Sequence, residues 1–430
     1  MEHWLTNGER EEVIEKMLLW GLIKWDNARK LPLKKGGMTD VYVMLRDMRN
    51  HPEAQKFFGR IYSNPIMRLN AQRFIEVPTA VSGLASQIST SVNIPYITVR
   101  DNPKKGRVAA ADYIGEFRRG EIVPIIDDVI TDGASKVVPY SVAKRFGVKQ
   151  HIPMIVLVDR QQGWREKFLE LGIESDVWSA MTLHHIRRYL IENNLMERCN
   201  PLIEENNPLI VAYDNRSWDE ILPFIDSLRT TGCIIKVNDL LFNRGIEDLI
   251  PNLQVYGRVM ADLKSHDIPK TVANIMKHLL PCPPWAVTVH ASGAGEMIRA
   301  ATKTLSNTPT KVLAVTVLTS IDPVTCDEVY RRRPIKQVEK LAQIAHEAGA
   351  HGFVCSPQEV SMLKRDYPQM ICVTPGIRSV DQETHDQKRV DTPQKALEQG
   401  SDYLVMGRQI LGNPNPVAEV ERLLHEEILI

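Results

Sequence analysis

The stretch VMADLKSHDIPKT (259–271) begins as an apolar run and ends in charged residues. Its first part is continuously apolar, which is typical of a strand buried on both faces. Side chains alternate along a strand, so Asp262 and Lys264 are expected on the same side, with Asp267 on the following loop within reach of the same ammonium. A lysine flanked by carboxylates stays protonated and rigidly held, as an acid that delivers a proton requires. An exposed network of surface charges is the alternative interpretation.

Seven further runs of the same kind lie on either side of this stretch. They are LIVAY (209–213), CIIKV (233–237), AVTVH (286–290), VLAVTVL (312–318), GFVC (352–355), MICVT (370–374) and YLVMG (403–407). Eight buried strands separated by helical patterns predict a (β/α)₈ TIM barrel over 208–430. The carboxyl ends of barrel strands meet on one face, so the polar residues at these ends should converge there. They are Asp214, Lys236, Asp262, Lys264, His290, Thr319, Ser320, Thr374 and Arg408.

Three glycine- and arginine-containing segments follow the last two predicted strands. They are VTPGIR (373–378), HDQKRV (385–390) and MGR (406–408). Barrels commonly bind phosphate at this position through backbone N–H groups and an arginine. An ordinary turn with a solvated arginine is the alternative, and the position in barrel order favours phosphate.

The motifs of 208–430 resemble, in the right order, those of the orotidine 5′-monophosphate decarboxylase family. The specific ones are ADLKSHDIPKT, VTPGIR and DQKRV. The resemblance implies a cofactor-free decarboxylation at C6 of the pyrimidine, with Lys264 as proton donor and Asp262 beside the substrate carboxylate. It further implies that Asp267 and Thr271 reach in from a partner subunit.

The same resemblance assigns the remaining contacts to the substrate. Asp214 and Lys236 would hold ribose hydroxyls and extend the charge network, Thr319 and Ser320 would contact the base, and Arg378, Gln387, Gly407 and Arg408 would bind the phosphate. Two residues depart from the family pattern. Asn238 and Ala294 each replace a glycine, and neither is expected to touch the acid.

The first half of the chain also predicts an α/β domain. RFIEV (73–77), YITVR (96–100), IVPII (122–126) and MIVLVD (154–159) are expected as four parallel strands with helices on both faces, a Rossmann-like arrangement. The first seventy residues, including 17–24 and the basic turn 34–37, are expected to form a helical hood.

The segment IIDDVITDGASK (125–136) joins a buried strand to a helix through two acids and a short turn. Its N–H groups and helix N-terminus suit a 5′-phosphate, while Asp127 and Asp128 can accept from ribose hydroxyls. A merely capped turn is disfavoured because two adjacent buried acids are costly without a ligand. The segment resembles the diphosphoribosyl-binding signature of type I phosphoribosyltransferases.

Residues around this signature resemble orotate phosphoribosyltransferase over about 20–190. The matching stretches are LPLKKGGMTDVYVMLR (31–46), IEVPTAVSG (75–83) and LVDRQQGW (157–164). The implied binding residues are Lys34, Arg100, Lys104, Asp127, Asp128, Thr131, Gly133, Ser135 and Arg160, with Mg²⁺ accompanying phosphoribosyl diphosphate. Asp101 stands where the family has a pyrophosphate-binding lysine, which leaves open a domain that binds or dimerises without turnover.

The bulk composition fits two globular domains, at 1–198 and 208–430, joined by a polar linker at 199–207. The 430 residues include 53 basic and 53 acidic side chains, which argues against nucleic acid or a membrane as partner. The beginning, MEHWLTNGER, has no basic region leading into an apolar run, so no signal peptide is expected. Six scattered cysteines suggest free thiols in a reducing cytoplasm.

Together the halves resemble the UMP synthase family, whose fused domains convert orotate and phosphoribosyl diphosphate to orotidine 5′-phosphate and then to UMP and CO₂. A homodimer or higher homo-oligomer is expected. Two alternatives remain open. A phosphosugar decarboxylase or isomerase on the same barrel would also use the DxKxxD spacing. The other is a decarboxylase whose first half is a non-catalytic or weakly active binding or dimerisation domain.

Overall fold

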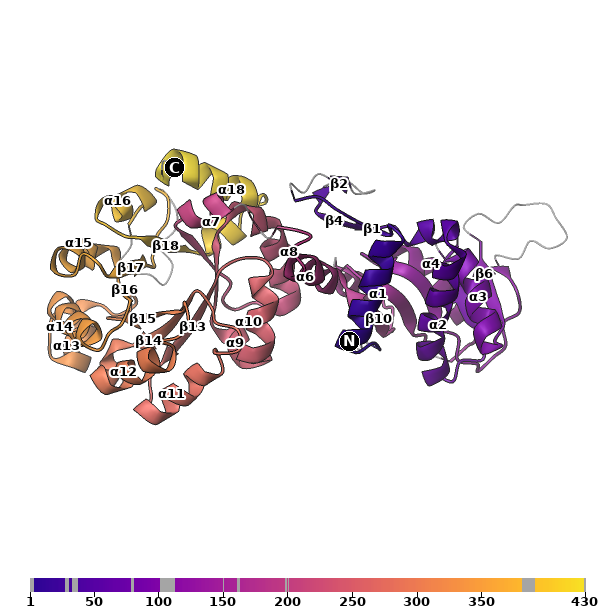
Figure 1. Ribbon diagram of the computed structural model, residues 1–430, viewed down its shortest axis with the longest axis horizontal. Helices are drawn as coiled ribbons and strands as arrows, with labels where there is room; N and C mark the ends of the chain where they lie inside the picture. The colour runs from indigo at the N-terminus through magenta and orange to yellow at the C-terminus, as the bar shows by residue number, and fades with distance from the viewer. Residues whose placement is uncertain are drawn as a thin grey trace. The chain divides into compact units, whose positions relative to one another are not determined.

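The computed structural model describes residues 4–27, 31–32, 38–78, 81–100, 113–149, 151–160, 163–197, 199, 201–380 and 391–428. The chain divides into two compact units, Met1–Met196 and Glu197–Ile430 (Figure 1).

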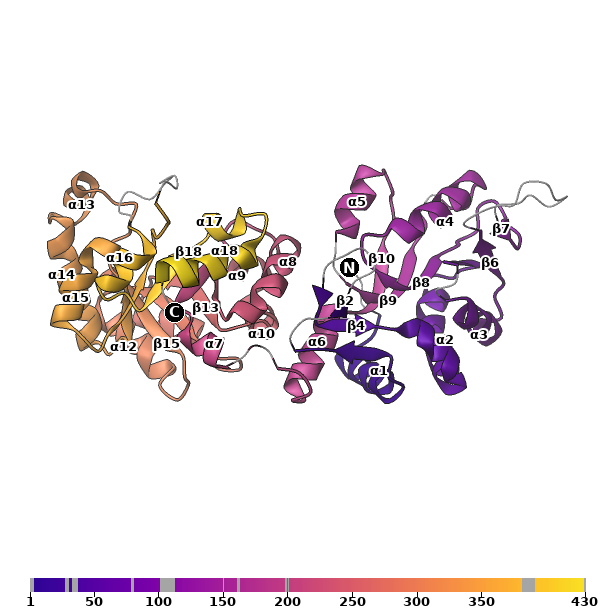
Figure 2. The ribbon, with the colours of Figure 1, turned by 90° about the horizontal axis from the view of Figure 1, so that it is seen from above.

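The first unit is built on a six-stranded sheet. In spatial order its strands are β10 (Val177–Thr182), β9 (Met154–Asp159), β8 (Ile125–Ile130), β5 (Phe74–Glu76), β6 (Tyr96–Val99) and β7 (Tyr113–Ile114), and Figure 2 shows β8, β9 and β10 side by side. All neighbours are parallel except β6 and β7. The four expected strands are present, and β7 and β10 were not expected. Ser179 and Thr182 interrupt the apolar run of β10, which hid that strand in the sequence.

Helices cover both faces of this sheet because its strands bury alternate residues on opposite sides. Phe74 of β5 packs in one core, and the next residue, Ile75, packs in the other. The first core includes residues of α1 (Asn7–Leu19), α2 (Pro52–Arg68), α3 (Ser82–Val92) and α6 (Leu183–Glu192), and the second includes residues of α4 (Ala134–Arg145) and α5 (Trp164–Glu170).

The expectation of a helical hood over the first seventy residues is only partly right. Short antiparallel strands stand between its helices: β1 (Ile23–Trp25) pairs with β4 (Val41–Val43), and β2 (Leu31–Pro32) pairs with β3 (Met38–Thr39). A 3₁₀ turn, η1 (Leu45–Asn50), leads into α2. The hood is fixed to α6 by a buried bidentate pair, in which Arg187 donates to Asp40 at 2.8 and 2.9 Å.

The second unit is a closed barrel of eight parallel strands, which confirms the expected TIM barrel. Its strands are β11 (Leu209–Ala212), β12 (Ile234–Val237), β13 (Val259–Ser265), β14 (Ala286–His290), β15 (Lys311–Val315), β16 (Gly352–Val354), β17 (Ile371–Thr374) and β18 (Tyr403–Met406). Strand β18 pairs with β11 and closes the barrel. Figure 1 shows these strands inside a ring of helices.

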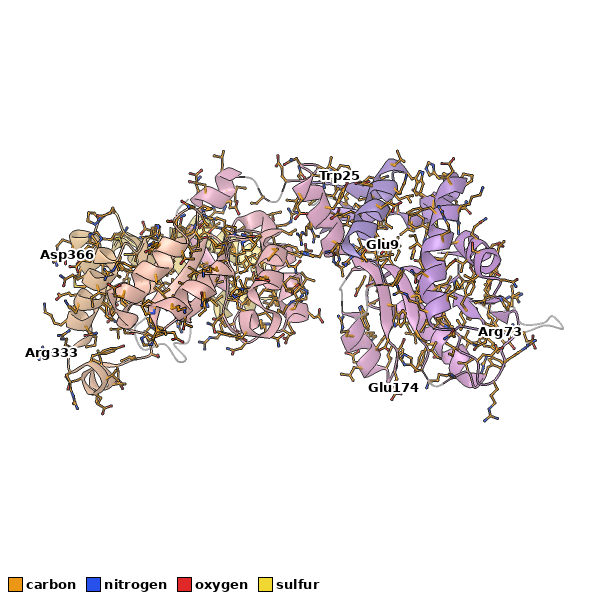
Figure 3. The ribbon with its side chains drawn as sticks, turned by 60° about the horizontal axis from the view of Figure 1, so that its bottom comes forward. Glu9, Trp25, Arg73, Glu174, Arg333 and Asp366 are labelled. Carbon is orange, nitrogen blue, oxygen red and sulfur yellow. The ribbon has the colours of Figure 1, made fainter. Side chains whose placement is uncertain are left out.

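The helices of this ring follow the strands in order. They are α8 (Trp218–Leu228), α9 (Asp239–Arg244), α10 (Ile246–Gln254), α11 (Pro269–Lys277), α12 (Ala294–Thr304), α13 (Pro323–Tyr330), α14 (Pro334–Glu347), α15 (Pro357–Asp366), α16 (Pro393–Glu398), α17 (Arg408–Leu411) and α18 (Pro416–Arg422), and 3₁₀ turns η2 (Arg229–Thr231) and η3 (Ala291–Gly293) and a π-helical turn, η4 (Leu423–Ile428), complete the unit. Several begin with a proline, whose missing N–H costs nothing in the first turn. Arg333, before α14, and Asp366, at the end of α15, lie at the outer edge of the ring (Figure 3).

Residues 199–207 are not the expected linker. Pro201–Asn206 form helix α7, and Arg258 of the barrel unit donates to the carbonyl oxygens of Glu204 and, at 3.3 Å, Asn207. The side-chain amide of Asn207 donates to the Thr231 carbonyl at 2.7 Å. This segment is therefore part of the second unit.

An apolar cluster within the barrel supports the residues at the strand ends. Ile234, Met260 and Ala286 pack in this cluster. Because side chains alternate along strands, the residues two positions further on point to the same side. They are Lys236, Asp262 and Thr288.

All six cysteines are free thiols, as expected, and four of them are buried. In the part of the chain that the structure describes, we find no helix with the length and apolar character needed to cross a membrane.

Candidate active site

Four charged side chains at the ends of β11, β12 and β13 form one continuous network. The Lys236 ammonium donates to both carboxylate oxygens of Asp214, at 2.7 and 2.9 Å, and to Oδ2 of Asp262 at 3.0 Å. The Lys264 ammonium donates to the same Asp262 oxygen at 2.6 Å. Lys236 and Asp262 are buried, whereas the side chain of Lys264 remains 34% exposed. The network therefore has a buried pair, Lys236 and Asp262, and an accessible ammonium on Lys264.

Thr288 of β14 completes this network and was missed from the sequence. Its hydroxyl donates to Oδ1 of Asp262 at 2.8 Å and accepts from the backbone N–H of Lys264 at 2.9 Å. The side chain is fully buried. Thr288 lies two residues after Ala286, so the alternation of side chains along the strand would have predicted it beside Asp262.

Strand β13 is irregular where it carries the lysine. Its register shifts between Ala261 and Ser265, and Lys264 has a φ of +46°, which is unfavourable for a residue with a Cβ. Simple alternation thus does not describe how Lys264 reaches Asp262. Asn238 stabilises the distortion, because its amide donates to the carbonyl of Asp262. Asn238 thus contacts the backbone of Asp262, whereas the Lys264 ammonium donates to the Asp262 carboxylate.

Asp262 and Lys236, the two buried members of the network, stabilise each other's charges. Burial alone would raise the pKa of Asp262, but the ammonium groups of Lys236 and Lys264 and the hydrogen bonds from Lys264 and Thr288 hold that pKa at about 2. Burial lowers the pKa of Lys236, yet the adjacent Asp262 and Asp214 carboxylates raise it above its usual value overall. The Asp262 carboxylate therefore stays ionised between two ammonium groups.

Asp267 does not flank Lys264 within one chain, contrary to the expectation from spacing. It is exposed, and its carboxylate accepts from the backbone N–H of Ile268 at 2.6 Å. Among the described residues, the Lys264 ammonium donates only to Asp262. Thr271 lies half-buried in the first turn of α11.

Two histidines lie at the same end of the barrel. His290 ends β14, and its ring centroid is 5.6 Å from that of His266, which follows β13. Burial first, and then the nearby His266 and Lys264, lower the pKa of His290. A neutral imidazole beside Lys264 leaves the ammonium as the principal positive charge there.

The expected phosphate residues lie after β17 and β18. Arg378 follows β17, and its backbone N–H donates to the Asp391 carbonyl at 3.2 Å. A Cβ on Gly407 would lie 3.1 Å from the Ala212 carbonyl oxygen, so the chain passes close to β11 there. The exposed Arg408 lines a pocket of about 680 Å³ with Ser379 and Gln409. Gln387 lies outside the described residues.

The expected base contacts, Thr319 and Ser320, come after β15. Thr319 is buried and Ser320 is exposed. Ala294, the second departure from the family pattern, has a φ of +70°, a conformation that favours glycine.

The sequence profile described as the orotidine 5′-phosphate decarboxylase / HUMPS family matches residues 207–423, half of the chain. The chain belongs to this family. A relative named orotidine 5′-phosphate decarboxylase from Chromobacterium violaceum is 39% identical over 244 residues, which is 54% of this chain and 97% of that protein. A protein of the same name from Pseudoalteromonas translucida is 39% identical over 221 residues, covering 50% of this chain and 94% of its own.

Two solved structures are similar to part of the chain. The crystal structure of orotidine 5′-phosphate decarboxylase from Lactobacillus acidophilus is 34% identical, with a TM-score of 0.46 over 51% of this chain and 99% of its own. That of Leishmania donovani UMP synthase is 26% identical, with a TM-score of 0.37 over 44% of this chain and 40% of its own.

The first unit precedes the decarboxylase-family match and has its own pair of acids within β8. The Asp127 carboxylate is buried and paired with the ammonium of Lys136, on α4. Lys136 also donates to the Val129 carbonyl at 2.7 Å and to Ser135 Oγ at 3.1 Å, and its side chain is only 2% exposed. All three ammonium hydrogens thus have acceptors inside the protein. Lys136 was not among the residues predicted from the sequence, although it ends the segment 125–136.

Asp128, the second acid, is in a different state. Burial and the adjacent Asp127 raise its pKa to about 7, against the smaller opposing effects of Lys136 and Arg46. The Arg46 guanidinium, from the hood, is 3.8 Å from Asp128. The Asp128 carboxylate also accepts from the backbone N–H of Val129 at 2.7 Å.

The other expected transferase residues lie near this turn or on strand ends of the same unit. Gly133 has a φ of +75°, and a Cβ there would meet the ring of Phe168. Ser135 Oγ donates to Asp127 at 3.3 Å and Thr131 Oγ1 to Asp132 at 3.4 Å. The Arg160 guanidinium lies 5.9 Å from the ring of Tyr42 in β4, and Arg100 is exposed after β6. Lys34, Asp101 and Lys104 lie outside the described residues.

The described residues of both units contain no group of three or more His, Cys, Asp or Glu side chains arranged to hold a metal ion. An Mg²⁺ that arrives with phosphoribosyl diphosphate would take phosphate oxygens as ligands and needs no such group.

Proposed function

We propose that the barrel unit decarboxylates orotidine 5′-monophosphate to UMP and CO₂ without a cofactor. The observation that carries the proposal is the Asp214–Lys236–Asp262–Lys264 network at the carboxyl end of a barrel that belongs to the decarboxylase family. The substrate carboxylate, the ribose hydroxyls and the phosphate all need polar or charged partners at one end of the barrel. The network supplies the partners of the carboxylate and of the ribose.

The chemistry follows from the last two members of the network, Asp262 and Lys264. Asp262 stays ionised, so a substrate carboxylate placed beside it is repelled in the ground state and relieved as CO₂ leaves. The electron pair of the broken bond remains on C6. The Lys264 ammonium, accessible and bonded to one carboxylate, then donates its proton to that carbon.

Binding energy comes from groups far from the reacting carbon. Asp214 and Lys236 contact the ribose, Thr319 and Ser320 the base, and Arg378, Gln387, Gly407 and Arg408 the phosphate. An arginine makes charge-assisted, often bidentate contacts with phosphate. That energy holds the substrate carboxylate against Asp262.

The complete site includes residues of a second copy of the chain. Asp267 and Thr271 come from the partner subunit of a homodimer. This is supported by the exposure of Asp267 and of the apolar side chain of Ile268, which is 64% exposed between them. Mixing the inactive variants Lys264→Ala and Asp267→Ala under exchange conditions should give one intact site per heterodimer. If subunits exchange and activity does not return, the site is not shared.

A substrate comparison tests the proposed reaction against the phosphosugar alternative. Orotidylate consumption is followed by ultraviolet absorbance in EDTA, and a 3-keto-hexulose 6-phosphate is offered in parallel. Turnover of orotidylate alone supports the proposal. Turnover of the keto sugar alone would assign the barrel to the other chemistry.

The first unit is proposed to bind phosphoribosyl diphosphate with Mg²⁺ and to transfer its ribosyl group to orotate slowly. The turn Asp127–Ser135 and Arg160 support binding. Asp101, where a lysine is expected, removes a cation from the departing pyrophosphate and adds an anion. A non-catalytic binding unit is the second candidate, favoured by Lys136, which neutralises Asp127 internally.

Calorimetric binding of Mg²⁺–phosphoribosyl diphosphate and turnover of orotate separate these candidates. We expect binding with slow turnover, and faster turnover in Asp101→Lys. A wild-type rate of roughly 1–10³ s⁻¹ without gain in Asp101→Lys would show that Asp101 does not slow the transfer. No turnover in either form would favour the non-catalytic unit.

A further inference from the structure

One glutamine side chain joins the two segments that carry the phosphate-binding arginines. Gln409 directly follows Arg408, and Ser379 directly follows Arg378. The Gln409 amide oxygen accepts from the backbone N–H of Ser379 at 3.0 Å, and its amide nitrogen donates to the Ser379 hydroxyl at 2.6 Å. The loop after β17 and the first turn of α17 are therefore tied by a two-point contact.

A charged cluster from the end of the chain fixes this contact. The Gln409 amide nitrogen also donates to Glu419 of α18 at 2.8 Å. Arg422 donates to the same Glu419 oxygen at 2.8 Å and to the Ser379 hydroxyl at 3.1 Å. Glu419 accepts from the Gln409 amide nitrogen, and Arg422 holds both Glu419 and Ser379 in place, so Gln409 has a single orientation.

The geometry points to Gln409 as a positioning residue for phosphate recognition. We propose that it holds the Arg378 and Arg408 segments at the spacing that one phosphate group requires, without touching the substrate. The inference rests on the proposed decarboxylase function. It explains why a connected group of polar side chains, Ser379, Gln409 and Glu419, lies beside Arg408.

The consequence is a defect that depends on the substrate phosphate. In Gln409→Ala the two arginine segments lose their link, and a displacement of about 1 Å at a binding group costs on the order of 10²-fold in rate. We therefore expect kcat/KM for orotidylate to fall by roughly 10- to 100-fold. Orotidine, which lacks the phosphate, makes no use of the link and should be processed as slowly as by the wild type.

Three variants make the test specific. Ser379→Ala keeps the backbone N–H and loses only the hydroxyl, so its defect should be smaller than that of Gln409→Ala. Gln409→Glu places a carboxylate against Glu419 and should be at least as impaired as the alanine variant. Gln394→Ala is the matched control, because Gln394 lines the same pocket but donates to Glu398 on its own helix at 3.0 Å.

Kinetics with both substrates on the full chain decide the question. A fall with orotidylate and no change with orotidine, together with wild-type behaviour of Gln394→Ala, supports the proposal. An equal fall with both substrates would show a merely structural role, and an unchanged kcat/KM for orotidylate would show no role; either overturns it. If the wild type itself does not decarboxylate orotidylate, the proposed function fails first, and that result is distinct.

Discussion

Each unit of the chain has a lysine paired with an aspartate of a parallel strand, and the two lysines are in opposite situations. Lys264 makes one side-chain hydrogen bond among the described residues and is 34% exposed. Lys136 donates to three protein acceptors and is 2% exposed. The same residue pair is open to a substrate in the barrel and closed in the first unit.

The difference lies in how each pair is neutralised. In the barrel, two ammonium groups share Asp262, so one of them has donors to spare. In the first unit, the Lys136 ammonium pairs with Asp127, and burial together with the adjacent Asp127 raises the pKa of Asp128 to about 7. A Lys–Asp pair indicates chemistry only when the lysine retains an unsatisfied donor and access to solvent.

The largest expected effect is that of Lys264→Ala on decarboxylation. A general acid is worth roughly 10²–10⁴-fold, and this lysine also neutralises Asp262, so the loss of kcat should exceed that range. Circular dichroism and UMP binding should remain near wild type. Lys277→Ala, an exposed lysine bonded to Asn274, is the control. More than a tenth of wild-type kcat in Lys264→Ala would rule out the assignment.

Lys136→Met should affect stability rather than decarboxylation. It leaves the buried Asp127 carboxylate without its cation, which costs about 3–5 kcal/mol. Differential scanning calorimetry should show a lower transition for the first unit. The double variant with Asp127→Asn should recover much of the loss. An unchanged transition in Lys136→Met would mean that this pair does not close the site.

Arg408→Ala should mainly raise KM for orotidylate. A hydrogen bond to a charged group is worth roughly 1.5–3 kcal/mol, so we expect an increase of about 10- to 100-fold with a smaller fall in kcat. Steady-state kinetics check this, with the exposed Arg365→Ala as control. Unchanged kinetics would place the phosphate elsewhere.

The smallest effect concerns the pH dependence of the first unit. Because the pKa of Asp128 is about 7 when folded, above its ordinary value of 3.8, the folded unit binds this proton more tightly than the unfolded chain. Its stabilising effect is complete below pH 4 and is lost as the pH rises through 7. Asp128→Asn should reduce the change in melting temperature between pH 5 and 8 by a few degrees, because 1 kcal/mol shifts the melting temperature by about 2–4 °C. A slope equal to wild type would assign the titration to another group.

The barrel could be predicted from sequence because each strand is a continuous apolar run ending in a polar residue. Lys236, Asp262 and Lys264 followed from that pattern. Thr288 and the distortion at Lys264 did not, because a hydroxyl inside an apolar run carries no charge signal and a register shift depends on the neighbouring strand. Asp267 lies on the loop after β13, where side-chain alternation along a strand no longer sets its direction.

The first unit was less predictable for a related reason. The two adjacent acids made segment 125–136 stand out, but the pKa of Asp128 depends on burial, on Asp127 and on Lys136, which reaches back from the next helix. Burial decides that Lys136 closes the pair, and burial of a particular lysine is not visible in a linear pattern. The short strands of the hood have too few residues to show a period.

Measuring both activities in one preparation of the full chain tests the contrast between the two units most directly. Decarboxylation is assayed with orotidylate in EDTA, and transfer is assayed with orotate, phosphoribosyl diphosphate and Mg²⁺. We predict decarboxylation at a rate ordinary for enzymes, roughly 1–10³ s⁻¹, and much slower transfer. Transfer that equals or exceeds decarboxylation, or no decarboxylation at all, would contradict the account of an open lysine in the barrel and a closed one in the first unit.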